Sequence, residues 1–181
     1  MARLRVPRFG TGKGRVILGM SRSIFTMIHL LLSLAAICSG FVFIAGLLNR
    51  KLFEGWVLTY FFASILTVVT GFLFPFDHLL RSHILGLLSL LVLTIAVFVR
   101  VISDLVGVWR VVYVVMCAAA LYFNCFAAVV QLFAKIPALT ALAPTGTEPP
   151  YVAAQSVVFA LFVALTYVAS KRFGVGLDRT M

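Results

Sequence analysis

Long apolar runs, separated by short polar segments, make up most of the chain. A helix rises about 1.5 Å per residue, so roughly 20 apolar residues are needed to cross a hydrocarbon core about 30 Å thick. Five runs reach about this length, and they cover residues 24–48, 56–74, 84–103, 108–133 and 152–170. A membrane barrel would instead show short segments of alternating polarity. The pattern therefore predicts an all-α membrane protein with five transmembrane helices.

Composition excludes the soluble and disordered classes of protein. Of the 181 residues, 63 % are hydrophobic and 11 % are charged, and the mean hydropathy is +1.15. A water-soluble domain has about a quarter of its residues charged, and one of this length could not bury so many apolar side chains. We therefore expect one transmembrane domain over residues 24–170, between a basic tail (1–23) and a short C-terminal tail (171–181).

Charge around the first run predicts the orientation. The first 23 residues contain six Arg or Lys residues and no Asp or Glu. Basic residues beside the first span favour the cytoplasmic side, so we expect the N-terminus in the cytoplasm. Anionic lipid is the expected partner of this tail, and nucleic acid is excluded because no folded basic face could follow a phosphate backbone. An acid-free, Arg-rich start also fits a mitochondrial transit peptide, which leaves the mitochondrial inner membrane as an alternative.

Two parts of the chain repeat one pattern: a histidine opens an apolar helix, and the next helix carries Trp-x-x-x-Tyr. The matching positions are His29, Trp56 and Tyr60 in the first copy and His83, Trp109 and Tyr113 in the second. The His-to-Trp spacing is 27 residues in the first copy and 26 in the second. The repeat predicts two tandem hairpins, helices 1–2 and helices 3–4, with a fifth helix outside the repeat. Both tryptophans would lie at one membrane interface and both histidines near the other.

Polar side chains inside the spans are the candidate site. No Asp or Glu lies well inside a span, which argues against a carboxylate proton relay. Six softer side chains are expected in the cytoplasmic half of the bundle: His29, Thr70, His83, Asn124, Gln131 and Gln155. Two interpretations are open, because such groups either form hydrogen bonds between helices or line a pocket for a small lipid-soluble ligand.

The two histidines permit a further interpretation. Imidazoles on two helices can be the axial ligands of a b-type haem, and the small residues Ser33 and Gly86 beside them would let a flat macrocycle approach. Asp77, His78 and His83 are weaker candidates for a divalent metal, because their spacing matches no standard pattern. The chain has no Ser-His-Asp set, no phosphate-binding glycine loop and no His-Glu-x-x-His helix, so we expect no catalytic residues.

Several short motifs between residues 28 and 155 resemble a known family. They are TGFLFP at 70–75, His83-x-x-Gly86-x-x-Ser89, QLFAKIPAL at 131–139, APT at 143–145 and EPP at 148–150. Together they resemble a family of small multipass bacterial membrane proteins with no assigned function. The resemblance implies a bacterial cytoplasmic (inner) membrane and no known catalytic residues. The paired-hairpin layout is also similar to that of bis-histidine membrane cytochromes.

These features together predict a non-enzymatic five-helix bundle without a cofactor. It would act as an accessory subunit of a larger membrane complex or as a binder of a small lipid-soluble ligand. The alternative is a haem b electron carrier that uses His29 and His83 as ligands. A homodimer across the fifth helix, which has no counterpart in the repeat, is also compatible with the layout.

Overall fold

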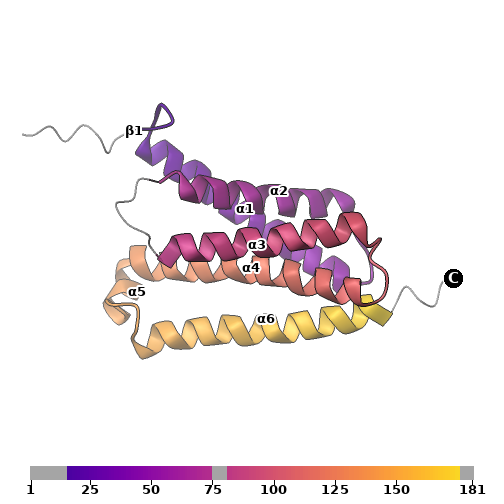
Figure 1. Ribbon diagram of the computed structural model, residues 1–181. Coiled ribbons are helices and arrows are strands. Elements are labelled where there is room, and N and C mark those ends of the chain that lie inside the picture. Colours follow the sequence, from indigo (N-terminus) through magenta and orange to yellow (C-terminus); the bar gives the residue numbers. More distant parts are fainter. Residues whose placement is uncertain (1–15, 75–80, 176–181) are drawn as a thin grey trace, which may run out of the picture.

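The computed structural model describes residues 16–74 and 81–175, and within them it confirms the predicted fold class. Among these residues, five helices are long and apolar enough to cross a membrane (Figure 1). They are α1 (Arg22–Leu48), α2 (Glu54–Phe72), α3 (Arg81–Ile102), α4 (Val108–Lys135) and α6 (Pro149–Val175). The remaining elements are short: β1 (Val16–Ile17) and β2 (Met20–Ser21) pair antiparallel just before α1, and α5 (Pro137–Leu142) lies between α4 and α6.

The first four long helices form a closed four-helix bundle. Each packs against its neighbour along the chain, and α1 packs against α4 to close the ring. The predicted tandem hairpins, α1–α2 and α3–α4, are therefore confirmed. Helix α6 lies outside this ring, against α4 and α1 (Figure 1). Helix α1 consequently contacts three other long helices, whereas α3 packs against its two neighbours in the ring.

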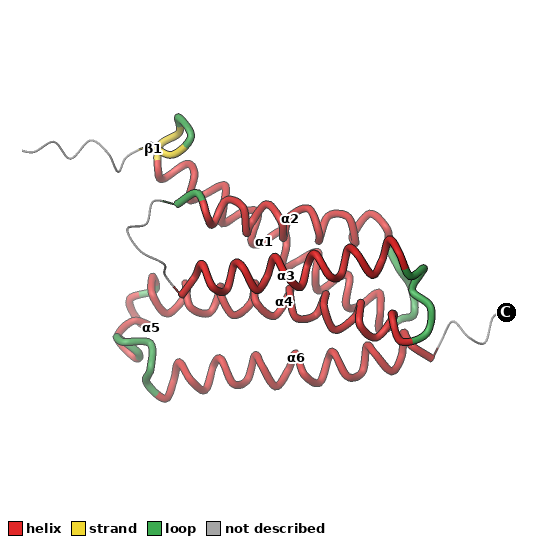
Figure 2. The backbone as a smooth tube through the Cα atoms, in the orientation of Figure 1, coloured by secondary structure: helices red, strands yellow, loops and turns green. Residues whose placement is uncertain are grey.

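The chain direction gives the bundle two distinct ends (Figure 2). One end holds the start of α1, the end of α2, the start of α3 and α5, and we call it the histidine end because His29 and His83 lie there. The other end holds the α1–α2 and α3–α4 connections and the end of α6, and we call it the tryptophan end. Trp56 and Trp109 both lie at this second end, 48 % and 46 % exposed, as expected for side chains at one interface.

The two connections at the tryptophan end are tight turns. Arg50 has a positive φ of 57° after α1, and a Cβ at Gly46 would lie 2.8 Å from the carbonyl oxygen of Lys51. Only glycine allows the returning chain to pass so close to the last turn of α1. Positive φ also occurs at Leu105 after α3, and the buried Arg110 holds that turn by donating from Nε to the Leu105 carbonyl oxygen.

Aromatic side chains fill the centre of the bundle. Tyr60 and Tyr113, the equivalent tyrosines of the two hairpins, are both fully buried. The ring of Phe43 stacks on Tyr60 with centroids 5.5 Å apart and meets Tyr113 edge-on at 5.9 Å. Helix α1 comes close to α4 at Gly40, where a Cβ would lie 2.5 Å from Leu121 Cδ1. Small residues at such crossings increase van der Waals contact, which is a principal source of helix association in lipid.

Candidate functional site

The first of the candidate residues, His29, forms a hydrogen bond within its own hairpin. Its Nδ1 lies 2.8 Å from Thr70 Oγ1, while the same hydroxyl donates to the Leu66 carbonyl oxygen at 2.7 Å. A threonine hydroxyl has one proton to donate; while Thr70 donates it to the Leu66 carbonyl oxygen, the tautomer with hydrogen on His29 Nδ1 completes the bond to Thr70. The edge of the Phe74 ring packs against the imidazole, with centroids 5.3 Å apart. His29 therefore joins α1 to the last turn of α2.

His83 is buried against the end of α2, which belongs to the other hairpin. Its ring centroid lies 5.6 Å from that of Phe72. Phe72 also fills the space beside Gly86, where a Cβ would lie 3.1 Å from Phe72 Cζ. The surface of Gly86 is therefore not available to a flat macrocycle, and this packing does not fit a haem placed there. The haem alternative stays a prediction, which a visible absorption spectrum tests.

The amide side chains of the candidate set form separate contacts between pairs of helices. Asn124 Nδ2 donates to Ser64 Oγ at 3.4 Å, which links α4 to α2. Gln155 Nε2 donates to the Phe126 carbonyl oxygen at 3.3 Å, which links α6 to α4, and its buried Oε1 has no partner in the described part of the chain. Gln131 is exposed.

The six polar residues thus lie in the half of the bundle toward the histidine end, where His29 with Thr70, Asn124 and Gln155 form three separate interhelical hydrogen bonds. This arrangement corresponds to the first of the two interpretations, hydrogen bonding between helices. For the weaker metal candidates, Asp77 and His78 lie outside the described residues. Within residues 16–74 and 81–175, no group of three or more His, Cys, Asp or Glu side chains is placed to hold a metal ion.

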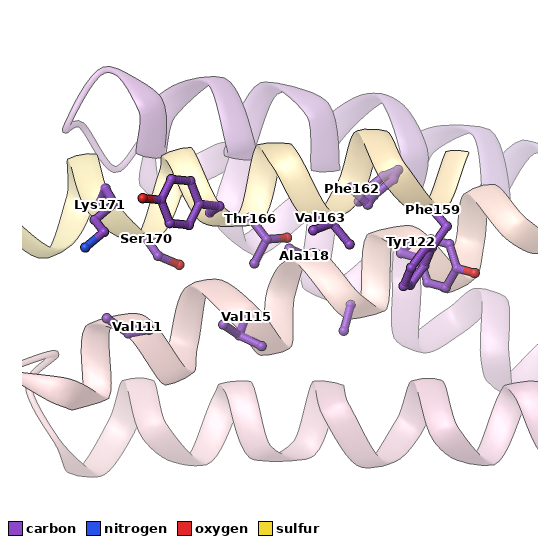
Figure 3. A pocket seen from close by; sticks show the side chains of 12 residues that line it. Val111, Val115, Ala118, Tyr122, Phe159, Phe162, Val163, Thr166, Ser170 and Lys171 are labelled. Atoms are coloured by element: carbon purple, nitrogen blue, oxygen red, sulfur yellow. The ribbon is translucent and has the colours of Figure 1, made fainter. Parts of the chain in front are cut away.

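A different site lies between α4 and α6, where an elongated groove of about 630 Å³ opens along the bundle (Figure 3). Small and aliphatic side chains of α4, among them Val115 and Ala118, form one wall. A stripe of α6 forms the other wall, with Phe159 and Val163 exposed by 56 % and 53 %. The groove is therefore open on one side, and its lining is largely apolar.

The two ends of this groove differ in chemistry. Toward the middle of the bundle it ends at Tyr122, whose ring packs edge-on against Phe159 and Phe162 with centroids 5.8 Å away in both pairs. Toward the tryptophan end it reaches Ser170 and Lys171 (Figure 3). The groove therefore has an aromatic end inside the bundle and a polar, cationic end near its surface.

The length of the groove follows from the helix rise. Phe159 and Lys171 are 12 residues apart on α6, which corresponds to about 18 Å along the axis. One leaflet of a hydrocarbon core about 30 Å thick is about 15 Å deep. The groove thus spans the depth that one lipid chain occupies.

One feature of the sequence indicated this groove, but its residues were not among the six predicted site residues. Thr166 and Ser170 stand four residues apart on α6, so they share one face of this helix, and Lys171 follows directly after Ser170. Polar groups on one face of a span indicate a cavity or a packed interface. The alanines that leave room on α4 gave no comparable signal, because small residues are common wherever helices meet in membranes.

Hydrogen bonds order both ends of helix α6, the first set within its own connection and the second to α1. At its start, the Glu148 carboxylate accepts hydrogen bonds from the backbone N–H groups of Thr145 and Thr147, both at 3.0 Å. The bond from the Thr145 backbone is the main reason why the pKa of Glu148 falls from 4.5 to about 2. Near its end, Arg172 Nη1 donates to the Leu48 carbonyl oxygen of α1 at 3.4 Å.

Comparison with known proteins adds no further assignment. No family model, curated protein or solved structure matches the chain. The resemblance to a family of small multipass bacterial membrane proteins accordingly stays a prediction.

Proposed function

We propose that this protein is a non-enzymatic multipass membrane protein that binds a small lipid-soluble ligand in the groove between α4 and α6. The observation that carries the proposal is the groove itself, whose volume of about 630 Å³ lies within the range of roughly 300–1,000 Å³ typical of ligand pockets. Its apolar walls suit a hydrocarbon chain, because an unfilled apolar groove forgoes the dispersion contacts that a ligand would make.

The polar residues near the histidine end support this choice indirectly. His29, Asn124 and Gln155 each donate a hydrogen bond to another helix, so their donors at those atoms are already used within the bundle. Interhelical hydrogen bonds of this kind contribute about 0.6–2 kcal/mol each to helix association. We therefore assign these residues to holding the helices together and place the ligand along α4 and α6.

The proposal includes a membrane and an orientation. We propose a bacterial cytoplasmic membrane with the N-terminus in the cytoplasm, supported by the six basic residues in the first 23 positions. An accessory role in a larger complex, or a homodimer across α6, is compatible with ligand binding and stays a prediction.

Photocrosslinking in a bilayer tests the proposal with the full-length protein. The chain is reconstituted into vesicles that contain phosphatidylcholine with a diazirine on one acyl chain, and crosslinked residues are located by mass spectrometry. We expect labelling of the groove residues of α4 and α6 well above that of other exposed positions on α6. Val163→Trp fills the groove and should reduce this labelling at least fivefold.

Val157→Trp is the matched control, since Val157 is also an exposed valine of α6, at 68 %, but does not line the groove. It should leave groove labelling unchanged. Equal labelling of all exposed positions, or equal behaviour of the two tryptophan variants when both are folded and monodisperse, would overturn the proposed function.

A further inference from the structure

We infer that the groove selects an anionic phospholipid of the surrounding bilayer, with one acyl chain between α4 and α6 and its phosphate at Lys171. This inference rests on the proposed function and adds the headgroup to it. The groove ends near the tryptophan end of the bundle, which is where lipid headgroups lie if Trp56 and Trp109 mark the interface.

Lys171 is placed to receive an anion at the mouth of the groove. Its Nζ lies 5.8 Å from the centroid of the Tyr167 ring, and both side chains line the groove. An ammonium over an aromatic face is held there by a cation–π interaction, which leaves its charge available. Lys171 forms no ion pair with a carboxylate among the residues that the structure describes.

Ser170 adds an unused polar group beside Lys171. Its Oγ is buried and has no hydrogen-bond partner within the described chain. Figure 3 shows the Ser170 hydroxyl directed into the space between α6 and α4. A buried hydroxyl without a partner is costly, and a phosphate or ester oxygen of a lipid headgroup would accept its hydrogen bond after a small rotation of the side chain.

The charge around the mouth favours an anion over a zwitterion. The described residues at the tryptophan end that carry charge are the cations Arg50, Lys51, Arg100, Arg110, Lys171 and Arg172 and the carboxylates Glu54 and Asp104. Glu54 and Arg100 form an ion pair, so neither of them adds to the net positive charge. Clusters of basic residues next to membrane-spanning helices attract anionic headgroups. Arg172 also bonds the Leu48 carbonyl oxygen, which fixes the last turn of α6 beside α1.

The apolar walls of the groove favour a lipid over a soluble anion. A soluble phosphate would meet Lys171 and Ser170 only, and it would leave the apolar surface along Val163 and Phe159 without a ligand. A phospholipid satisfies both ends, because its chain covers about 18 Å of groove while its headgroup remains at the interface. Its second acyl chain stays in the bilayer, since the groove is open on one side.

The test compares two lipids that carry the same photoreactive acyl chain, phosphatidylglycerol and phosphatidylcholine, each at a few per cent of otherwise neutral vesicles. For the wild-type protein we expect groove labelling by phosphatidylglycerol to exceed that by phosphatidylcholine about fivefold, which is the size of effect that one lysine exerts at a membrane surface. Raising the ionic strength should lower this ratio by screening the charge.

Two charge variants test whether Lys171 is the residue that causes the preference for phosphatidylglycerol. Lys171→Gln should bring phosphatidylglycerol labelling down to the phosphatidylcholine level. Lys51→Gln, which removes one exposed charge from the same end without touching the groove, should leave the ratio above threefold. A free fatty acid with the same diazirine chain forms the third arm, and it should label the groove less than phosphatidylglycerol does.

The outcomes distinguish failure of headgroup selectivity from failure of lipid binding. If both phospholipids label the groove equally and Val163→Trp still abolishes labelling, the lipid-binding function stands and the headgroup selectivity is overturned. If the fatty acid labels more strongly than phosphatidylglycerol, the ligand is a single-chain acid and the phospholipid assignment fails. If no lipid labels the groove selectively, the proposed function fails as well.

Discussion

The two hairpins carry equivalent residues but use them differently. Tyr60 and Tyr113 occupy the same position in the repeat and are both fully buried. The hydroxyl of Tyr60 donates to the Cys117 carbonyl oxygen on α4 at 2.8 Å, whereas that of Tyr113 has no partner among the described residues. His29 likewise bonds within its own hairpin, whereas His83 packs against Phe72 of the other one. Sequence equivalence therefore does not imply equivalent contacts.

The cause of this asymmetry is the position of each hairpin in the bundle. Helix α6 packs against α1 and α4, one helix from each hairpin, so the pair α1 and α4 becomes the centre and α2 and α3 become peripheral. Gly40 of α1 accordingly lies at a close crossing with α4, while the residue at the matching position of α3, Thr94, is exposed. A fifth helix outside the repeat is enough to make two similar hairpins energetically different.

Gly40→Leu is expected to lower the free energy of unfolding more than any other change proposed below. It disrupts the close contact between α1 and α4, which has no equivalent at Thr94 of α3. A Cβ at Gly40 already approaches Leu121 Cδ1 to 2.5 Å, so a larger side chain must push α1 away from α4. Overpacking of this kind costs about 3 kcal/mol. Thr94→Leu, the matched change on α3, should alter stability by less than about 0.5 kcal/mol. Thermal unfolding in mild detergent measures both, and equal midpoints would contradict the close crossing.

Removing one hydroxyl from each buried tyrosine sharpens the comparison further. Tyr60→Phe deletes the bond to the Cys117 carbonyl oxygen and should destabilise the protein by about 1 kcal/mol. Tyr113→Phe removes a buried hydroxyl without a partner and should be neutral or slightly stabilising. Equilibrium unfolding in mixed detergent micelles provides both free energies. A larger loss of stability in Tyr113→Phe than in Tyr60→Phe would contradict the assigned hydrogen bonding of the two tyrosines.

A smaller effect is expected at the histidine end of the first hairpin. Thr70→Val removes the acceptor of the His29 Nδ1 hydrogen bond and should cost about 0.6 kcal/mol. Thr59→Val is the control on the same helix, since the Thr59 hydroxyl donates to the Gly55 carbonyl oxygen of its own helix. Nitrogen NMR of labelled histidine should report loss of the Nδ1 bond in Thr70→Val alone. An unchanged His29 spectrum would contradict the assigned pairing.

The smallest expected effect is a change in amide exchange in the connection between α5 and α6, which contains Glu148. The pKa of Glu148 is lowered to about 2 from 4.5, so its carboxylate stabilises the connection above pH 4.5 and this contribution is lost as the pH falls toward 2. Amide exchange at Thr145 and Thr147, corrected for the intrinsic pH dependence, should therefore accelerate over that range. Glu148→Gln should show the faster exchange at every pH, and wild-type-like protection in that variant would exclude the carboxylate as the acceptor.

The spans could be predicted closely from the sequence because a helix in lipid is a local property. The fourth run was expected at 108–133 and α4 covers Val108–Lys135, whereas α6 begins three residues before the expected 152. Pro149 and Pro150 occupy its first turn, where the missing N–H groups carry no penalty. The short helix α5 was not predicted, since Pro137 stands within a proline-rich segment that also fits a loop. The pairing of helices into two hairpins was readable from the repeat.

The candidate site was less predictable. Depth along the bundle follows from chain direction, so the sequence could place His29, Thr70, His83, Asn124 and Gln155 in one half of it, and in the structure they lie toward the histidine end. That this half is cytoplasmic stays a prediction. Which of these side chains meet depends on how each helix is rotated about its axis. A span that is apolar nearly all round does not reveal that rotation, because lipid and protein interior are similar solvents for it.

The amino-acid order alone therefore determined the number of long apolar helices, their approximate limits and the division into two hairpins and one extra helix, since length and apolarity act within each segment. Only the tertiary structure decided that α6 lies against α1 and α4, that one tyrosine hydroxyl is bonded and its counterpart is not, and that a groove reaches Lys171. The physical reason is that these features arise from contacts between faces of different helices, and such contacts depend on the packing of the whole bundle.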